Sequence, residues 1–198
     1  MDCNNYTLGT EFLFQNGCLS SCNSLSMSGI YPQSKIENVL ACPLTTDKWV
    51  QFFVPEIVDI PELKPDMEDI ISINSCVEIL CQRVIKTPEV TGYTNSNGEY
   101  IHGYEIDNAE CTRLTGRKLI IEGLIKQKIT YTALLPEQSL HSASYKIPFS
   151  VFIIIEKDTP LSKTFKVTPY IEDVYACRLS ERSIFKNSTI FIKAQSIC

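Results

Sequence analysis

The chain has 198 residues, of which 44% are hydrophobic and 21% are charged, and its formal net charge is −5. This length suffices to bury a core as one domain or as two small ones. The acidic balance argues against a nucleic-acid-binding protein, which usually presents a basic face. The apolar run Val151–Ile155 falls far short of the roughly 20 residues of a membrane helix, so we expect no membrane insertion.

The first 35 residues are rich in Asn, Ser, Gly and Cys, with one apolar patch at Phe12-Leu13-Phe14. This composition predicts an extended N-terminal arm over residues 1–35 that has no core of its own. A single β-domain with a short C-terminal tail is then expected over residues 36–198. The opening MDCNNYTLGTEF is polar and lacks the basic and apolar regions of a secretory signal. We therefore expect the chain to be made, and at first kept, in a cytoplasm.

The segment after the arm contains strand-like runs separated by turns. Asp47–Val58 predicts a strand, with Trp49 in the core. Prolines in the following IPELKPDMEDI mark a turn, and Ile70–Ile85 then predicts one long strand or a strand pair. The loop after it contains Asn97-Gly98, which is typical of a hairpin turn.

The clearest strand runs from Lys118 to Ala133. Its odd-numbered positions are nearly all apolar and its even-numbered positions are mostly polar, which is the period of a strand with one buried face. Gly123, inside the run, indicates a bulge or a sharp bend. A strand of this length needs partners on both sides, and the rest of the chain is expected to supply them.

Three more strands are predicted to follow: Lys146–Glu156, Phe165–Arg178 and Ile184–Ala194. Many short strands, regular turns and the lack of a convincing amphipathic helix of about twelve residues predict an all-β fold, a β-sandwich. Lys118–Ala133 and Lys146–Glu156 should be neighbouring strands in it. The expected core residues are Leu119, Ile121, Ile125, Tyr131, Phe149, Val151 and Ile153.

Four segments, in this order, resemble the SPOCS domain of clostridial spore coat and spore morphogenesis proteins. They are IPELKPDMEDI at 60–70, GRKLIIEGLIKQKITYTA at 116–133, HSASYKIPFSVFI at 141–153 and VTPYIEDVYACRL at 167–179. Together the resemblance extends roughly from Trp49 to Ala194, most of the chain. It implies an all-β domain that works in spore-envelope assembly and has no known catalytic site. The cysteine-bearing arm and the terminal Cys198 lie beyond it.

The nine cysteines are an odd number, so internal pairing leaves at least one free or bonded to another molecule. A chain without a leader should not depend on disulfides while the cytoplasm stays reducing. This conflict disappears if the protein is released or oxidised later, for example when its mother cell lyses. Cysteines within or beside predicted strands are interpreted as small buried hydrophobes: Cys76, Cys81, Cys111 and Cys177.

Two other chemical roles for the cysteines, catalysis and metal binding, are not favoured. A Cys–His nucleophile would need one of the two histidines, His102 or His141, beside an activated cysteine such as Cys111, and no nucleophile elbow or oxyanion loop accompanies them. We therefore expect that the protein is not an enzyme. His141 is expected to make a structural hydrogen bond.

A zinc site could draw on the pairs Cys18-x3-Cys22 and Cys76-x4-Cys81. Cys76 and Cys81 differ in parity, however, and would face opposite sides of a regular strand. We therefore expect no metal and no other cofactor.

Four cysteines near the chain ends are the candidates for intermolecular disulfides: Cys3, Cys18, Cys22 and Cys198. Terminal cysteines can reach a neighbouring subunit without distorting a folded core. With the family resemblance, this placement predicts a self-assembling structural protein of the spore's outer layer (coat, exosporium or appendage), made in the mother-cell cytoplasm. Its partners are copies of itself and other spore coat proteins, not nucleic acid. The alternative is a non-polymerising adaptor that docks one coat morphogenetic protein.

Overall fold

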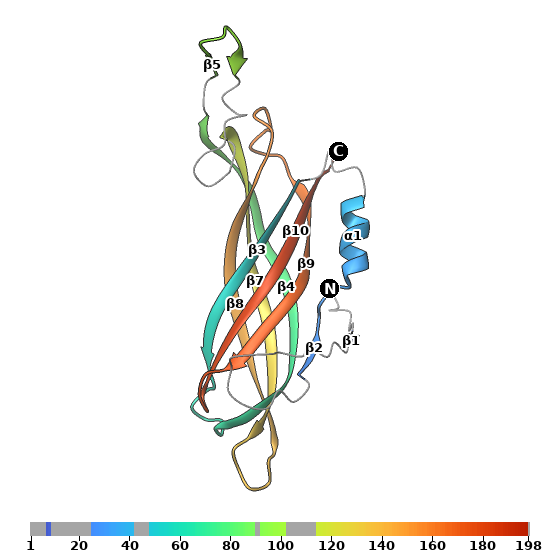
Figure 1. Ribbon diagram of the computed structural model, residues 1–198, viewed down its shortest axis with the longest axis vertical. Coiled ribbons are helices and arrows are strands. Elements are labelled where there is room, and N and C mark those ends of the chain that lie inside the picture. The colour runs from blue at the N-terminus through green and yellow to red at the C-terminus, as the bar shows by residue number, and fades with distance from the viewer. Residues whose placement is uncertain (1–6, 9–24, 42–47, 90–91, 102–113, 198) are drawn as a thin grey trace.

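The structure, a computed structural model, describes residues 7–8, 25–41, 48–89, 92–101 and 114–197. Two sheets face each other and enclose an apolar core, so the predicted all-β sandwich is confirmed (Figure 1). Among the described residues, no helix is long and apolar enough to cross a membrane.

The larger sheet has five strands in the order β1 (Thr7–Leu8), β2 (Ser26–Ser28), β4 (Met67–Glu89), β7 (Thr115–Ala133) and β8 (Leu140–Ile154). The smaller sheet has the order β3 (Lys48–Asp59), β10 (Ser183–Ser196) and β9 (Phe165–Arg178). A separate hairpin pairs β5 (Tyr93–Thr94) with β6 (Tyr100–Ile101).

The strand β7 lies inside the larger sheet, antiparallel to β4 on one side and to β8 on the other. Its alternating pattern fixes which face is buried, and the partners expected on both sides are present. Most of the predicted core residues are buried, and Val151 is half-buried against the same cluster; the buried ones are Leu119, Ile121, Ile125, Tyr131, Phe149 and Ile153.

A bulge occurs next to Gly123, but in the partner strand. The pairing of β4 with β7 shifts between Ile79 and Cys81, which leaves Leu80 of β4 without an opposite residue. Gly123 itself is required by close packing, because a Cβ there would lie 2.5 Å from the Phe149 ring and 2.6 Å from the carbonyl oxygen of Glu78. The glycine therefore lets the Phe149 ring lie against the backbone of β7.

The last part of the segment predicted as the arm packs onto the larger sheet. The strand β2 pairs in parallel with β4, and Leu25, Met27 and Ile30 contact the core. Gly29 adopts a φ of +90°, and a Cβ there would lie 1.8 Å from the carbonyl oxygen of Ser75. Residues 25–30 thus form part of the sandwich.

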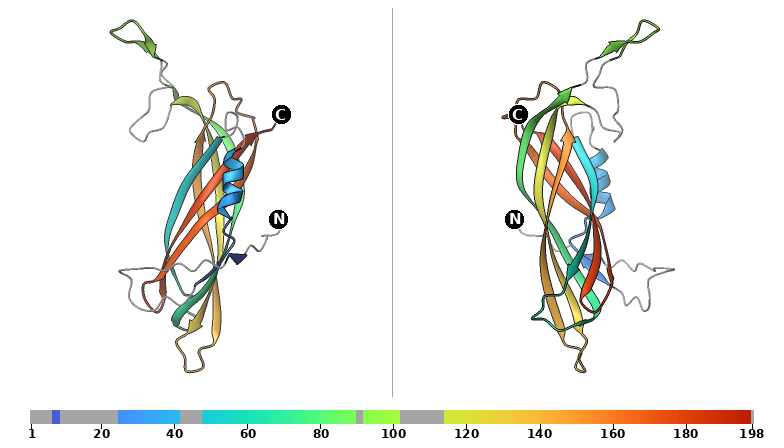
Figure 2. Two further views of the ribbon diagram at one scale, coloured as in Figure 1. Left: turned by 45° about the vertical axis from the view of Figure 1, so that its right-hand side comes forward. Right: turned by 90° about the vertical axis from the view of Figure 1, so that its left-hand side faces the viewer.

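A short helix, α1 (Gln33–Ala41), follows β2 and was not predicted. Its first turn starts after Pro32, whose carbonyl accepts hydrogen bonds from the backbone N–H groups of Lys35 and Ile36. Ile36 is buried and its helical neighbours on either side are exposed. The views in Figure 2 place α1 over the outer side of the smaller sheet.

The prediction that Trp49 belongs to the core is wrong. The inward-facing side chains of β3 are Val50, Phe52 and Val54, which pack against the core, whereas Trp49 is 47% exposed. Both parities of this strand are apolar, so alternation alone could not distinguish the inner face from the outer face.

Candidate assembly surface

The outer face of the smaller sheet carries a row of exposed apolar side chains. Trp49, Phe53 and Ile57 stand four residues apart on β3 and are 47%, 69% and 61% exposed. A strand turns every second side chain to the same side, so all three point outward from the same face. Isolated exposed apolar residues are ordinary, but three large ones on the same face of one strand mark a candidate interaction surface.

Aromatic rings continue this face across β10 and β9. Trp49 stacks on Phe191 with centroids 5.6 Å apart, and Phe191 in turn contacts Tyr170 at 6.1 Å. Phe185 and Tyr175 make an edge contact at 6.1 Å. Aromatic contacts thus occur in two places on this face, separated along β10 by Asn187 and Thr189.

The segment leading into α1 covers one end of this face. The backbone N–H of Tyr31 donates to the carbonyl of Ile171, and its ring lies 5.1 Å from Tyr170. Phe191 is only 2% exposed although it points outward. The part around Phe53 and Ile57 stays open, as their exposed fractions show.

The outer face of the larger sheet is different, because charged pairs cross it. Arg83 of β4 lies 2.8 Å from Glu122 of β7, and Lys126 lies 2.7 Å from Glu78. Hydrogen bonds from these cations lower the pKa of both carboxyl groups. Such exposed pairs contribute little to stability and are typical of a solvated face.

A polar layer lies between the two sheets. The buried side-chain amide of Gln127 donates to Ser75 Oγ at 3.0 Å and to Ser188 Oγ at 3.1 Å, which ties the larger sheet to the smaller one. Lys186 of β10, 1% exposed, also points inward, opposite Glu56 of β3. Burial lowers the pKa of its amine to about 8, although the charge of Glu56 opposes that shift.

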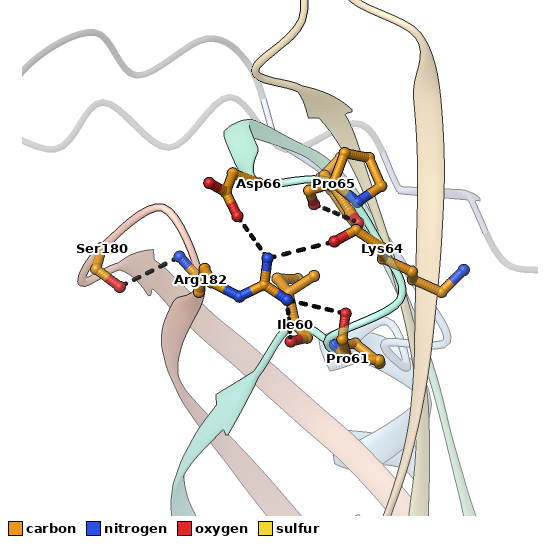
Figure 3. Close-up of polar contacts among 8 residues, drawn as sticks. Ile60, Pro61, Lys64, Pro65, Asp66, Ser180 and Arg182 are labelled. Atoms are coloured by element: carbon orange, nitrogen blue, oxygen red, sulfur yellow. Dashed lines mark hydrogen bonds and ion pairs between the residues drawn. The ribbon is translucent and has the colours of Figure 1, made fainter.

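One end of the sandwich is held by Arg182, in the turn between β9 and β10 (Figure 3). Its guanidinium donates to the backbone carbonyls of Ile60, Pro61 and Lys64 at 3.0, 2.9 and 3.3 Å, and it pairs with Asp66. The buried Tyr131 of β7 donates its hydroxyl to the carbonyl of Pro65 at 3.1 Å. The loop between β3 and β4 is thus fixed by both sheets.

The four candidate crosslinking residues lie outside the described residues: Cys3, Cys18, Cys22 and Cys198. Cys111 and His102 also lie outside them. His141 hydrogen-bonds Ser139 Oγ at 3.1 Å and stacks on Tyr131 at 6.0 Å, which is a structural environment.

The three described cysteines are not buried hydrophobes, contrary to prediction. Cys81 is exposed, and Cys76 and Cys177 are half-buried. Because Leu80 is bulged, Cys76 lies opposite Lys126 and Cys81 opposite Glu122, so both face outward rather than to opposite sides. Four residues of β7 separate their partners, about 13 Å, too far for a disulfide between the two. Within the described residues, no three metal-ligating side chains come together.

The model of the family described as "SipL, SPOCS domain" matches residues 66–178, more than half of the chain, and the chain therefore belongs to this family. Membership indicates a role connected with sporulation, in a family of structural and adaptor domains rather than enzymes. No curated protein and no solved structure matches the chain.

Proposed function

We propose that this chain is a self-assembling structural subunit of the outer layer of the spore. Subunits made in the reducing cytoplasm of the mother cell associate through their surfaces. Disulfides through Cys3, Cys18, Cys22 and Cys198 then link them once the surroundings become oxidising. The links make the assembly resist dissociation, which suits a protective envelope.

The position of the cysteines carries this proposal. Cysteine is among the most buried residue types, so it usually fills cores. In the described body, however, Cys76, Cys81 and Cys177 all occupy outward-facing strand positions, and neither core cluster contains a cysteine. The cysteines of the body thus do not fill its core, so core packing does not account for the cysteine content of the chain.

Replacement of Cys3, Cys18, Cys22 and Cys198 by Ser tests the proposal. Wild-type assemblies boiled in detergent without reductant should run as a ladder of multimers on a gel, and the quadruple variant should run as a monomer. A matched control, Cys81→Ser, should keep the ladder, because the proposed links run through the four terminal cysteines and not through the exposed Cys81. Circular dichroism should show the same strand content in all three proteins.

A wild-type chain that runs as a monomer in that gel would contradict covalent assembly. The adaptor role, in which one copy docks a coat morphogenetic protein without polymerising, would then be favoured. A ladder that survives in the quadruple variant would assign the crosslinks to other cysteines.

A further inference from the structure

The sheet edges of this domain are poorly suited to joining subunits. The long strands at the ends of the two sheets each contain a proline: Pro55 in β3, Pro148 in β8 and Pro169 in β9. The described residues give β4 no second partner strand beyond Asn74. Proline has no N–H to donate to an added strand, and natural sheets use it to discourage edge-to-edge pairing. Pairing through the edges of β3, β8 and β9 is therefore disfavoured, which leaves the sheet faces as candidates for subunit contacts.

Of the two outer faces, the one on the smaller sheet suits a contact between identical chains. Its outward positions on β3 and β10 around Phe53 are uncharged: Trp49, Gln51, Pro55 and Ile57 on β3, and Phe185, Asn187 and Thr189 on β10. The carboxylates come from β9, where Glu172 accepts a hydrogen bond from Gln51 at 2.7 Å and Asp173 lies opposite Thr189. The face of the larger sheet carries the pairs of Arg83 with Glu122 and Lys126 with Glu78. Two chains of net charge −5 repel each other, and a contact centred on β3 joins positions whose own side chains are uncharged, with the carboxylates of Glu172 and Asp173 beside it.

We propose that this open face, centred on Phe53, packs against the same face of a second copy of the chain. The row is self-complementary in a two-fold contact with antiparallel β3 strands. Phe53 then meets its own equivalent, while Trp49 of one copy meets Ile57 of the other, since each lies about 13 Å from Phe53 along the strand.

The size of the row suits a contact that forms reversibly. At the exposed fractions of Trp49, Phe53 and Ile57, the three side chains offer on the order of 300 Å² of apolar surface per copy, against about 800 Å² per partner in a standard interface. They form the apolar centre, and their polar neighbours form the rim. This inference rests on the proposed function, because disulfides then make a weak contact permanent.

Trp49, the one tryptophan of the chain, reports on this contact. The full chain is kept in excess reductant, so that association is non-covalent, and its mass is followed by sedimentation as concentration rises. Wild-type mass should increase, Trp49 emission should shift to the blue, and acrylamide quenching should fall at least twofold. Phe53→Glu and Ile57→Lys should each remove all three changes. The two variants shift the net charge in opposite directions, so a shared loss is not a net-charge effect.

Leu80→Glu is the matched control, since Leu80 is 59% exposed on a strand of the other sheet, and it should associate like the wild type. Two results overturn the proposed face and leave the proposed function intact. In the first, the wild type associates without a change in Trp49 emission or quenching; in the second, Phe53→Glu associates as strongly as the wild type. A wild type that stays monomeric in reductant but crosslinks on oxidation overturns the face alone. A wild type that is monomeric in both conditions overturns both.

Discussion

Lys186 is a buried cation in the middle of a strand whose neighbouring inward side chains are apolar or small. Its amine titrates near 8 in the folded chain, against an ordinary value of 10.5. At neutral pH the buried charge therefore costs about 3 kcal/mol, because each pKa unit corresponds to about 1.4 kcal/mol. The residue destabilises the sandwich and makes its stability depend on pH.

Stability should rise with pH between about 8 and 10. The folded-state pKa of Lys186 lies below the unfolded value, so the penalty is complete below pH 8 and fades toward 10.5. Burial raises the pKa of Tyr145 to about 12, which reverses the trend above pH 10 because the tyrosine ionises first in the unfolded chain.

Lys186→Met should raise the free energy of unfolding by about 2–3 kcal/mol at pH 7 and flatten its rise with pH, both measured by urea unfolding. The exposed Lys128→Met should do neither, and equal pH profiles for wild type and Lys186→Met would refute this reading.

Gly123 should tolerate no side chain. Gly123→Ala places a methyl group against the Phe149 ring and the Glu78 carbonyl, and overpacking of this kind costs about 1–3 kcal/mol. Phe149→Leu should recover part of that loss in the double variant, because it removes the ring but not the carbonyl. Unfolding free energies of the four chains form the cycle that measures it. Additive losses would show that the ring is not the obstacle.

At the scale of elements, Arg182 joins the turn between β9 and β10 to the loop between β3 and β4. Arg182→Met should cost about 2–3 kcal/mol, since it leaves the carbonyls of Ile60 and Pro61 without this charged donor. Arg182→Lys should recover little, because an ammonium cannot reproduce the planar fork of donors. Hydrogen exchange at residues 60–67 should be faster in both variants. The control Arg83→Met, at an exposed position, should change neither the free energy of unfolding nor this exchange rate. Full recovery by lysine would mean that charge alone matters.

The long strands could be predicted from the sequence, and the details that depend on packing between sheets could not. Alternation located β7 closely, because that strand has one clearly apolar face. It failed for Trp49, whose strand is apolar on both faces. It also failed for Cys81, because the bulge at Leu80 shifts the register and bulged residues have no sequence signature here. Buried Lys186 was missed because lysine is almost never found fully buried.

The assembly surface had a signal in the sequence that was interpreted differently. Trp49 was predicted to be buried in the strand Asp47–Val58, but a strand that contains a proline such as Pro55 is typically an edge strand. A strand with apolar residues on both faces can be buried in a core, or it can be an edge strand whose outer face is an interface. Deciding between them required the strand order, which places β3 at the edge of a sheet that α1 covers only in part.

At the scale of the whole molecule, the two outer faces differ in chemistry. The larger sheet presents charged pairs to solvent, while the smaller sheet presents aromatic and aliphatic groups around Phe53. Prolines on the long edge strands disfavour lateral sheet growth. In the proposed assembly, a subunit built in this way associates through one face, and its terminal cysteines then add covalent links without disturbing the sandwich.

The central claim is that this chain assembles with copies of itself and that oxidation makes the assembly permanent. The most direct measurement is the particle mass of the purified full chain after oxidation and strong dilution. The account predicts particles many times heavier than the 22.4 kDa chain that fall to that mass when reductant is added. A mass of 22.4 kDa in oxidised and reduced samples alike, at every concentration, would contradict it.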